Sequence, residues 1–268
     1  MKKNIILMAL AVAAFAACDK SVPYEPGAPM NLDNPNVYFS AYNATKTVLA
    51  SDATEFEVAL LRDDVETALT LPLKSACPYD GIFIVPETVE FPAGVDSISV
   101  KVQVSEKLEM FKDYQLFLTV PEEYTHAYVV SETGPRYIAN VVKEDYYPYA
   151  EGYFIELALL GKAYGRVLEY SPLKEEYRIK NAWMGGTTLA FGWDGENKVT
   201  PAKQYSTGLT YGNYGIVTVK TKAAAYTTVP ADYLGAEVPG FAFVFDYTVE
   251  AGTVGEDIPN YFAITKVL

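Results

Sequence analysis

The sequence has few of the residues on which most metal and nucleophile sites depend. Its 268 residues include one His, two Cys and two Trp. One His excludes a site with several His ligands, and two Cys cannot build a disulfide framework. The sequence also lacks a Gly-x-Ser-x-Gly nucleophile motif and a phosphate-binding glycine loop that leads into a helix. Zinc, nucleotide and serine-hydrolase chemistry are therefore not expected, and no cofactor is predicted.

Basic residues are also scarce. The chain has 21 Lys and Arg against 34 Asp and Glu, which gives a net charge of -13. An acidic chain repels phosphate backbones and anionic headgroups, so non-specific binding to nucleic acid or to anionic lipid is disfavoured. Half of the residues are apolar, which is enough for a folded core. The length suits one large domain or two smaller ones.

The N-terminal segment has the pattern of a secretory signal peptide. Lys2 and Lys3 precede an apolar run, residues 5–17, that ends at Cys18. This run is shorter than the ~20 residues of a membrane-spanning helix. The segment 15–18, Phe-Ala-Ala-Cys, resembles a bacterial lipobox, whose cysteine becomes the first mature residue and carries lipid. We predict a signal peptide over 1–17, a lipid on Cys18 and a Pro-rich tether over 18–34. The alternative is a buried N-terminal helix.

The remainder of the chain is predicted to be all-β. Short runs with period-2 alternation, separated by Pro, Gly and Asp, indicate seven or eight strands before residue 143. A polar, Pro-containing run over 143–149 interrupts the pattern, and strand signals then resume to the C-terminus. The segment 223–226 is expected to be a loop, and 107–112 could form a single helical turn. We predict two consecutive β-sandwich domains, over 35–144 and 145–268, after the signal peptide and tether.

Part of the first half resembles a known family. The segments 56–62, Phe-Glu-Val-Ala-Leu-Leu-Arg, 85–94, Val-Pro-Glu-Thr-Val-Glu-Phe-Pro-Ala-Gly, and 97–102, Ser-Ile-Ser-Val-Lys-Val, are similar to Calx-beta-like sandwich domains of Bacteroidetes lipoproteins. Many of these lipoproteins accompany outer-membrane importers of the starch-utilisation type. The resemblance, which covers about 37–143, implies a lipid-anchored protein of the outer membrane. It favours the cell surface over the periplasmic face, and it makes an importer a possible partner.

Metal binding and catalysis are both weighed against simpler interpretations. Calx-beta domains proper bind calcium through clustered acidic loops, and the nearest candidates here are Asp63, Asp64, Glu66 and Asp80. They have no recognisable ligand spacing, so a solvated acidic turn is preferred and no metal site is predicted. His126 is the only candidate general base, and it lies between two predicted strands without a partner motif. The chain is predicted not to be an enzyme.

Aromatic residues are the feature that exceeds background, with 22 Tyr in the chain. Trp183 is expected in the core, whereas Trp193, Tyr211 and Tyr214 stand beside glycines where the chain turns. Rings at such turns can present a flat apolar face with a polar edge, which suits sugars and extended peptides. Asp194 and Asn213 would be their hydrogen-bonding companions. The predicted ligand site is therefore Trp193, Asp194, Tyr211, Asn213 and Tyr214, with core packing of several of these rings as the alternative.

These observations favour a non-catalytic, lipid-anchored protein of the cell envelope. It would bind a glycan or another polymer, or an importer partner, in nutrient capture. The alternative is a structural or adhesion module whose sheets contact other proteins and hold no small-molecule site. The two differ in a testable feature, because a binding module should gather exposed rings at one concavity and an adhesion module should present a flat apolar patch.

Overall fold

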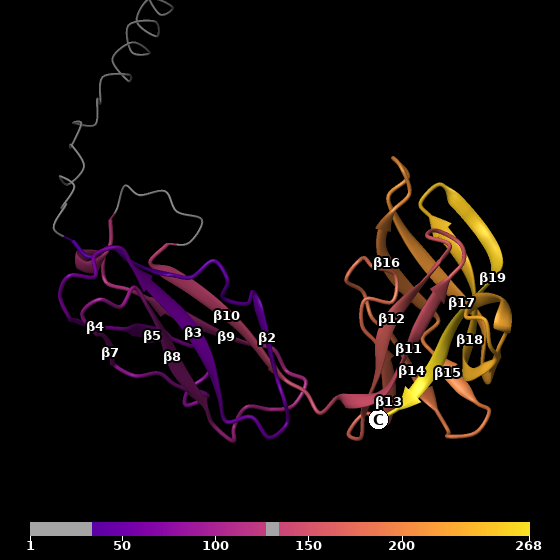
Figure 1. The fold of residues 1–268 in the computed structure, drawn as a ribbon, viewed down its shortest axis with the longest axis horizontal. Coiled ribbons are helices and arrows are strands. Elements are labelled where there is room, and N and C mark those ends of the chain that lie inside the picture. The colour runs from indigo at the N-terminus through magenta and orange to yellow at the C-terminus, as the bar shows by residue number, and fades with distance from the viewer. Residues whose placement is uncertain (1–33, 127–133) are drawn as a thin grey trace, which may run out of the picture.

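The computed structural model describes residues 34–126 and 134–268, and within these ranges it is all-β (Figure 1). The predicted signal peptide, Cys18 and residues 18–33 of the tether lie outside the described residues. Asn34, the last residue of the predicted tether, is buried, and its side-chain amide donates to the backbone oxygens of Glu123 and Thr125. No helix in the described ranges is long and apolar enough to span a membrane.

The first region contains two four-stranded sheets and a small two-stranded sheet around one core. One sheet has the order β1-β3-β8-β6 and the other β2-β10-β9-β5, while β4 pairs with β7. The strands are β1 (Val37–Phe39), β2 (Lys46–Leu49), β3 (Glu55–Arg62), β4 (Leu69–Pro72), β5 (Lys74–Ala76), β6 (Phe83–Ile84), β7 (Thr88–Phe91), β8 (Ser97–Val104), β9 (Tyr114–Thr119) and β10 (Arg136–Lys143).

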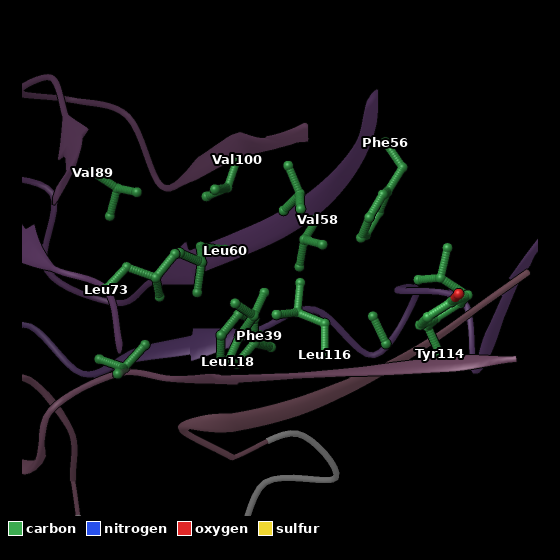
Figure 2. Close-up of a cluster of buried hydrophobic side chains, with 14 of the residues drawn as sticks. Phe39, Phe56, Val58, Leu60, Leu73, Val89, Val100, Tyr114, Leu116 and Leu118 are labelled. Carbon is green, nitrogen blue, oxygen red and sulfur yellow. The ribbon is translucent and has the colours of Figure 1, made fainter. Parts of the chain in front are cut away.

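Apolar and polar residues alternate along the strands of this sandwich and give each sheet an apolar inner face. In β3 every second side chain from Phe56 to Leu60 is buried, while the residues between them are more exposed. Figure 2 shows the result, with Val58, Leu60 and Val100 of one sheet meeting Leu116 and Leu118 of the other. Because the inner faces are apolar, the polar positions of both sheets are left on the outside.

The second region is a single antiparallel sheet of nine strands in the order β15-β14-β13-β12-β11-β19-β18-β17-β16. The sheet curls until β15 approaches β17, where Lys198 and Ala225 form an isolated bridge. One curled sheet thus supplies both layers around its core. The strands are β11 (Tyr147–Glu156), β12 (Lys162–Ser171), β13 (Glu176–Ile179), β14 (Leu189–Trp193), β15 (Val199–Pro201), β16 (Gln204–Thr210), β17 (Ile216–Val229), β18 (Val238–Val249) and β19 (Gly252–Val267).

Three local predictions are wrong. Residues 223–226, expected to form a loop, lie within β17 and pair with Phe241 to Val244 of β18 after a bulge. Alanine has a low strand propensity, but pairing with a long neighbouring strand overrides it. The break predicted over 143–149 is too long, because β10 continues to Lys143 and β11 already begins at Tyr147. Strands β2, β15 and β16 were not predicted, and 107–112 contains no helical turn.

The connection between the two regions is short and held on both sides. The guanidinium of Arg178 contacts Glu144 and Glu169, each at 2.6 Å, and lies 3.5 Å from the centroid of the Tyr146 ring. Tyr146 also donates its hydroxyl to Glu176. Burial and this contact raise the pKa of Tyr146. Side chains of the second region therefore anchor residues 144 and 146 of the connection.

On the side of the first region, Phe111 contacts the connection. Its ring meets Tyr146 edge to face at 5.9 Å, and the ammonium of Lys174 lies 4.1 Å from its centroid. Its backbone N–H donates to the carbonyl of Lys143 at the end of β10. Phe111 belongs to the first region and Lys174 to the second, so this aromatic and cationic cluster joins the two.

Candidate functional site

The predicted ligand residues lie at two separate places on the curled sheet. Trp193 stacks on Tyr226 near one end of β17, with ring centroids 4.7 Å apart. Tyr211 and Tyr214 lie in the β16–β17 connection, next to Ile216 at the other end of that strand. Ten residue steps along β17, from 216 to 226, separate these places by roughly 30 Å at about 3.3 Å per residue. The structure does not bring the five residues into one site.

Trp193 contributes mainly to the core. It packs edge to face on Phe241 at 5.1 Å and on Tyr177 at 5.5 Å, and its indole N–H donates to the carbonyl of Glu196 at 3.1 Å. Burial raises the pKa of Tyr177 to about 12, with neighbouring tyrosines adding to the effect. The indole is thus surrounded by rings, and its polar atom is already used within the hairpin.

Asp194 organises the turn beside it. One carboxylate oxygen accepts the backbone N–H groups of Glu196 and Lys198, at 2.9 and 3.1 Å. An Asp that closes its own turn in this way is common in tight connections. The geometry accounts for Asp194 without a ligand.

Tyr211 and Tyr214 are different, because both rings are exposed. Their exposed fractions are 47% and 57%, and the rings lie 6.2 Å apart with 30° between their planes. The tip of the β18–β19 hairpin, residues 249–254, adjoins them and completes a shallow hollow of about 260 Å³. We call this surface the tyrosine tip; it consists of Tyr211, Tyr214 and residues 249–254. Asn213 is exposed on the same connection.

Trp183, expected in the core, is fully buried. It contacts Phe154 at 5.7 Å and Phe245 at 5.8 Å and fills the interior of the curled sheet. The loop that carries it lies directly on β16, where Gly185 meets Gly208. A Cβ on either glycine would lie 2.3 Å from a backbone oxygen, so only glycine permits this approach.

The buried carboxylate of Glu156 is fully engaged. It accepts backbone N–H groups from Ala158, Leu159 and Leu160, and the hydroxyl of Tyr247. A carboxylate that receives this many donors holds a turn in place and has little capacity left for a substrate. The curled sheet thus uses its buried acid for structure.

The acidic residues considered for calcium do not form a cluster. Asp63 accepts from Asn36 at 2.6 Å, and Asp64 accepts the N–H of Glu66 at 2.9 Å. Asp80 precedes β6, which pairs with the far end of β8. In the part of the chain that the structure describes, no group of three or more His, Cys, Asp or Glu side chains is placed to hold a metal ion.

At one end of the sandwich, a cationic side chain of the protein itself binds the carbonyl groups of the loops. The guanidinium of Arg62, 3% exposed, donates to the backbone oxygens of Thr67, Pro92 and Val95 at 2.7–2.8 Å. These carbonyls are thereby satisfied by arginine.

Among the described residues, His126 has no partner with which it could form a catalytic pair. Its backbone N–H donates to the side-chain oxygen of Asn36 at 3.0 Å. The imidazole Nε2 is buried and has no hydrogen-bond partner among the described residues.

Comparison with known proteins gives distant structural neighbours only. No family model matches the chain, and no curated protein matches it. The apo form of a Calx CBD1 domain is similar at a TM-score of 0.32 and 16% identity, over 41% of this chain and 97% of that domain. A multidomain protein including DUF1735 from Bacteroides ovatus is similar at a TM-score of 0.35 and 11% identity, over 86% of this chain and 93% of that one.

A second Bacteroides ovatus protein, of unknown function, is similar at a TM-score of 0.32 and 9% identity, over 87% of this chain and 90% of that one. One of these neighbours is a Calx domain and the other two are Bacteroides ovatus proteins. TM-scores and identities of this size transfer no function, so the chemistry has to be inferred from the residues themselves.

Proposed function

We propose that this chain is a non-catalytic binding protein of the cell envelope that takes a glycan at the tyrosine tip. The observation that carries the proposal is the pair of exposed, nearly parallel Tyr rings beside a hollow. Exposed rings of this kind pack against the apolar face of a sugar, while their hydroxyls and neighbouring backbone groups bond its edge. Asn213, which lies between the two tyrosines in the sequence and is exposed, supplies an amide on the same connection.

A binding array with the mature chain, residues 18–268, tests this proposal. The double variant Tyr211→Ala, Tyr214→Ala should lose roughly tenfold to a hundredfold in affinity for any glycan that the parent binds at this surface. Tyr42→Ala is the matched control, because Tyr42 is 98% exposed in the first region. Binding that is unchanged in the double variant, or lost equally in the control, contradicts the proposal. Absence of any glycan ligand would favour the structural or adhesion alternative.

The proposal includes a lipid anchor on Cys18 at the outer membrane, facing the cell surface. The sequence of residues 1–18 supports it, because an apolar run with small residues ends at the cysteine. Mass spectrometry of membrane fractions should find Cys18 acylated, and Cys18→Ser should release the protein. An intact N-terminus beginning at Met1 contradicts this part. An importer that copurifies with the anchored form would be its partner.

A further inference from the structure

The outer face of the sheet β2-β10-β9-β5 carries a groove that follows β10. Alternate residues of this strand, Arg136, Ile138 and Asn140, point away from the core, whereas Ala139 and Val141 are fully buried. A hollow of about 470 Å³ shares Thr45 and Asn140 with a second of about 300 Å³. Arg136 lines both the second hollow and a third of about 350 Å³. The three thus follow one another along β10 through shared lining residues, and we call them together the β10 groove.

A pair of ordered amides lies at one end of the β10 groove. Gln115 donates its side-chain N–H to the Asn140 oxygen at 3.0 Å, and Asn140 donates to the backbone oxygen of Thr45 at 2.9 Å. These bonds set the orientation of both amides. Each amide has two N–H donors, so one donor on each remains, together with the Gln115 oxygen; none of these has a partner among the described residues. Ordered donors beside an acceptor match neighbouring hydroxyl groups.

Apolar surface accompanies the amides. Ile138, 47% exposed, lies on β10 between Asn140 and Arg136. Tyr79, 45% exposed, lines the same hollow as the amides, and its ring is held edge to face against Tyr114 at 5.1 Å. A ring and an aliphatic side chain beside hydrogen-bonding groups are what a ligand with one apolar face and a hydroxylated edge requires.

The charges of the groove balance. Three cationic side chains and three carboxylates line it: Lys46, Lys74, Arg136, Asp113, Glu122 and Glu123. The whole chain, by contrast, has a net charge of -13. A locally neutral groove on an acidic protein favours an uncharged ligand, because a polyanion is repelled by the remainder of the surface. We propose that the β10 groove is a second ligand site, which binds a neutral oligosaccharide independently of the tyrosine tip.

Titration of the mature chain with neutral linear glucan and mannan oligosaccharides tests the proposal. The double variant Gln115→Ala, Asn140→Ala should lose at least tenfold in affinity for one of these probes. Gln103→Ala, an exposed glutamine on the other sheet, is the matched control and should bind like the parent. Thermal melting of all variants verifies that the fold is kept.

The tip variant Tyr211→Ala, Tyr214→Ala distinguishes the two sites. If both exist, each double variant lowers the stoichiometry by one site and leaves the other. If only the tip variant reduces the stoichiometry, the groove site is overturned and the tip site is retained. Amide-dependent binding of polygalacturonate or of extended peptides, in place of neutral oligosaccharides, also overturns the proposal.

Discussion

The two regions fill their β cores with different kinds of side chain. Among the described residues, 4 of the 20 in the core cluster of the first region are aromatic, whereas 9 of the 18 in the larger core cluster of the second region are. Two facing sheets bring their inner surfaces within about 10 Å, a distance that Val and Leu fill. A single sheet that curls on itself encloses a wider interior, and rings such as Trp183, Phe243 and Phe245 fill it.

This difference changes how the aromatic excess is interpreted. Much of it belongs to the interior of the curled sheet and would be needed whether or not a ligand binds. Trp193 has four rings of the core region around it, so it too would be needed whether or not a ligand binds. Exposure separates Tyr211 and Tyr214 from Trp193 and from the rings that fill this core. The predictions below test how independent the two cores are, from the largest expected effect to the smallest.

The largest effect is expected from Trp183→Ala. Loss of this fully buried ring should destabilise the second region by about 3–5 kcal/mol, because the void it leaves cannot close. Urea denaturation followed by the fluorescence of the remaining Trp193 measures this. Leu173→Ala, at an exposed leucine of the same region, should change stability by less than about 0.5 kcal/mol. Equal effects from the two variants would contradict the assignment of Trp183 to the core.

Leu60→Ala tests the other core. Leu60 is fully buried between the two sheets, so its truncation should cost about 2–5 kcal/mol in the first region. Hydrogen exchange should show weakened protection in β3 and β8 and little change in β17 and β18. Uniform loss of protection through both regions would mean that they unfold as one unit.

Alkaline pH should weaken the second region more than the first. Burial raises the pKa of both Tyr177 and Tyr205 to about 12, from an ordinary value near 10. Between these values the unfolded chain releases the protons and the folded chain keeps them, so unfolding becomes more favourable as pH rises. Stability should be complete below about pH 10 and decline toward pH 12. The Tyr205→Phe variant should show a smaller decline, and an unchanged decline would contradict this cause.

The smallest effect is expected from Tyr146→Phe in the connection. The variant keeps the ring against Phe111 and Arg178 and removes only the hydrogen bond to Glu176. We expect a loss of about 0.5–1.5 kcal/mol. Tyr146→Ala, which also removes the ring, should make residues 144–146 sensitive to limited proteolysis. Cleavage of the parent chain at the same rate would show that this cluster does not hold the connection.

Much of the fold could be predicted from the sequence because alternation is a local property. The residues of β3 and β8, for example, are enough to predict the inner face of β3 and the full length of β8. Residues 223–226 and strands β15 and β16 could not be predicted in this way. Ala, Gly and Pro give weak strand signals when taken alone, so these segments become strands only through pairing with β14, β17 and β18.

The sequence by itself determined the all-β class and the acidic character, because each follows from composition or from neighbouring residues. Only the tertiary structure decided which rings are exposed and which polar groups meet. The curl of the sheet placed Trp193 among Tyr226 and Phe241, and the register of β9 and β10 set Gln115 beside Asn140. Such contacts join residues far apart in the chain, so the free energy of packing the whole sheet selects them.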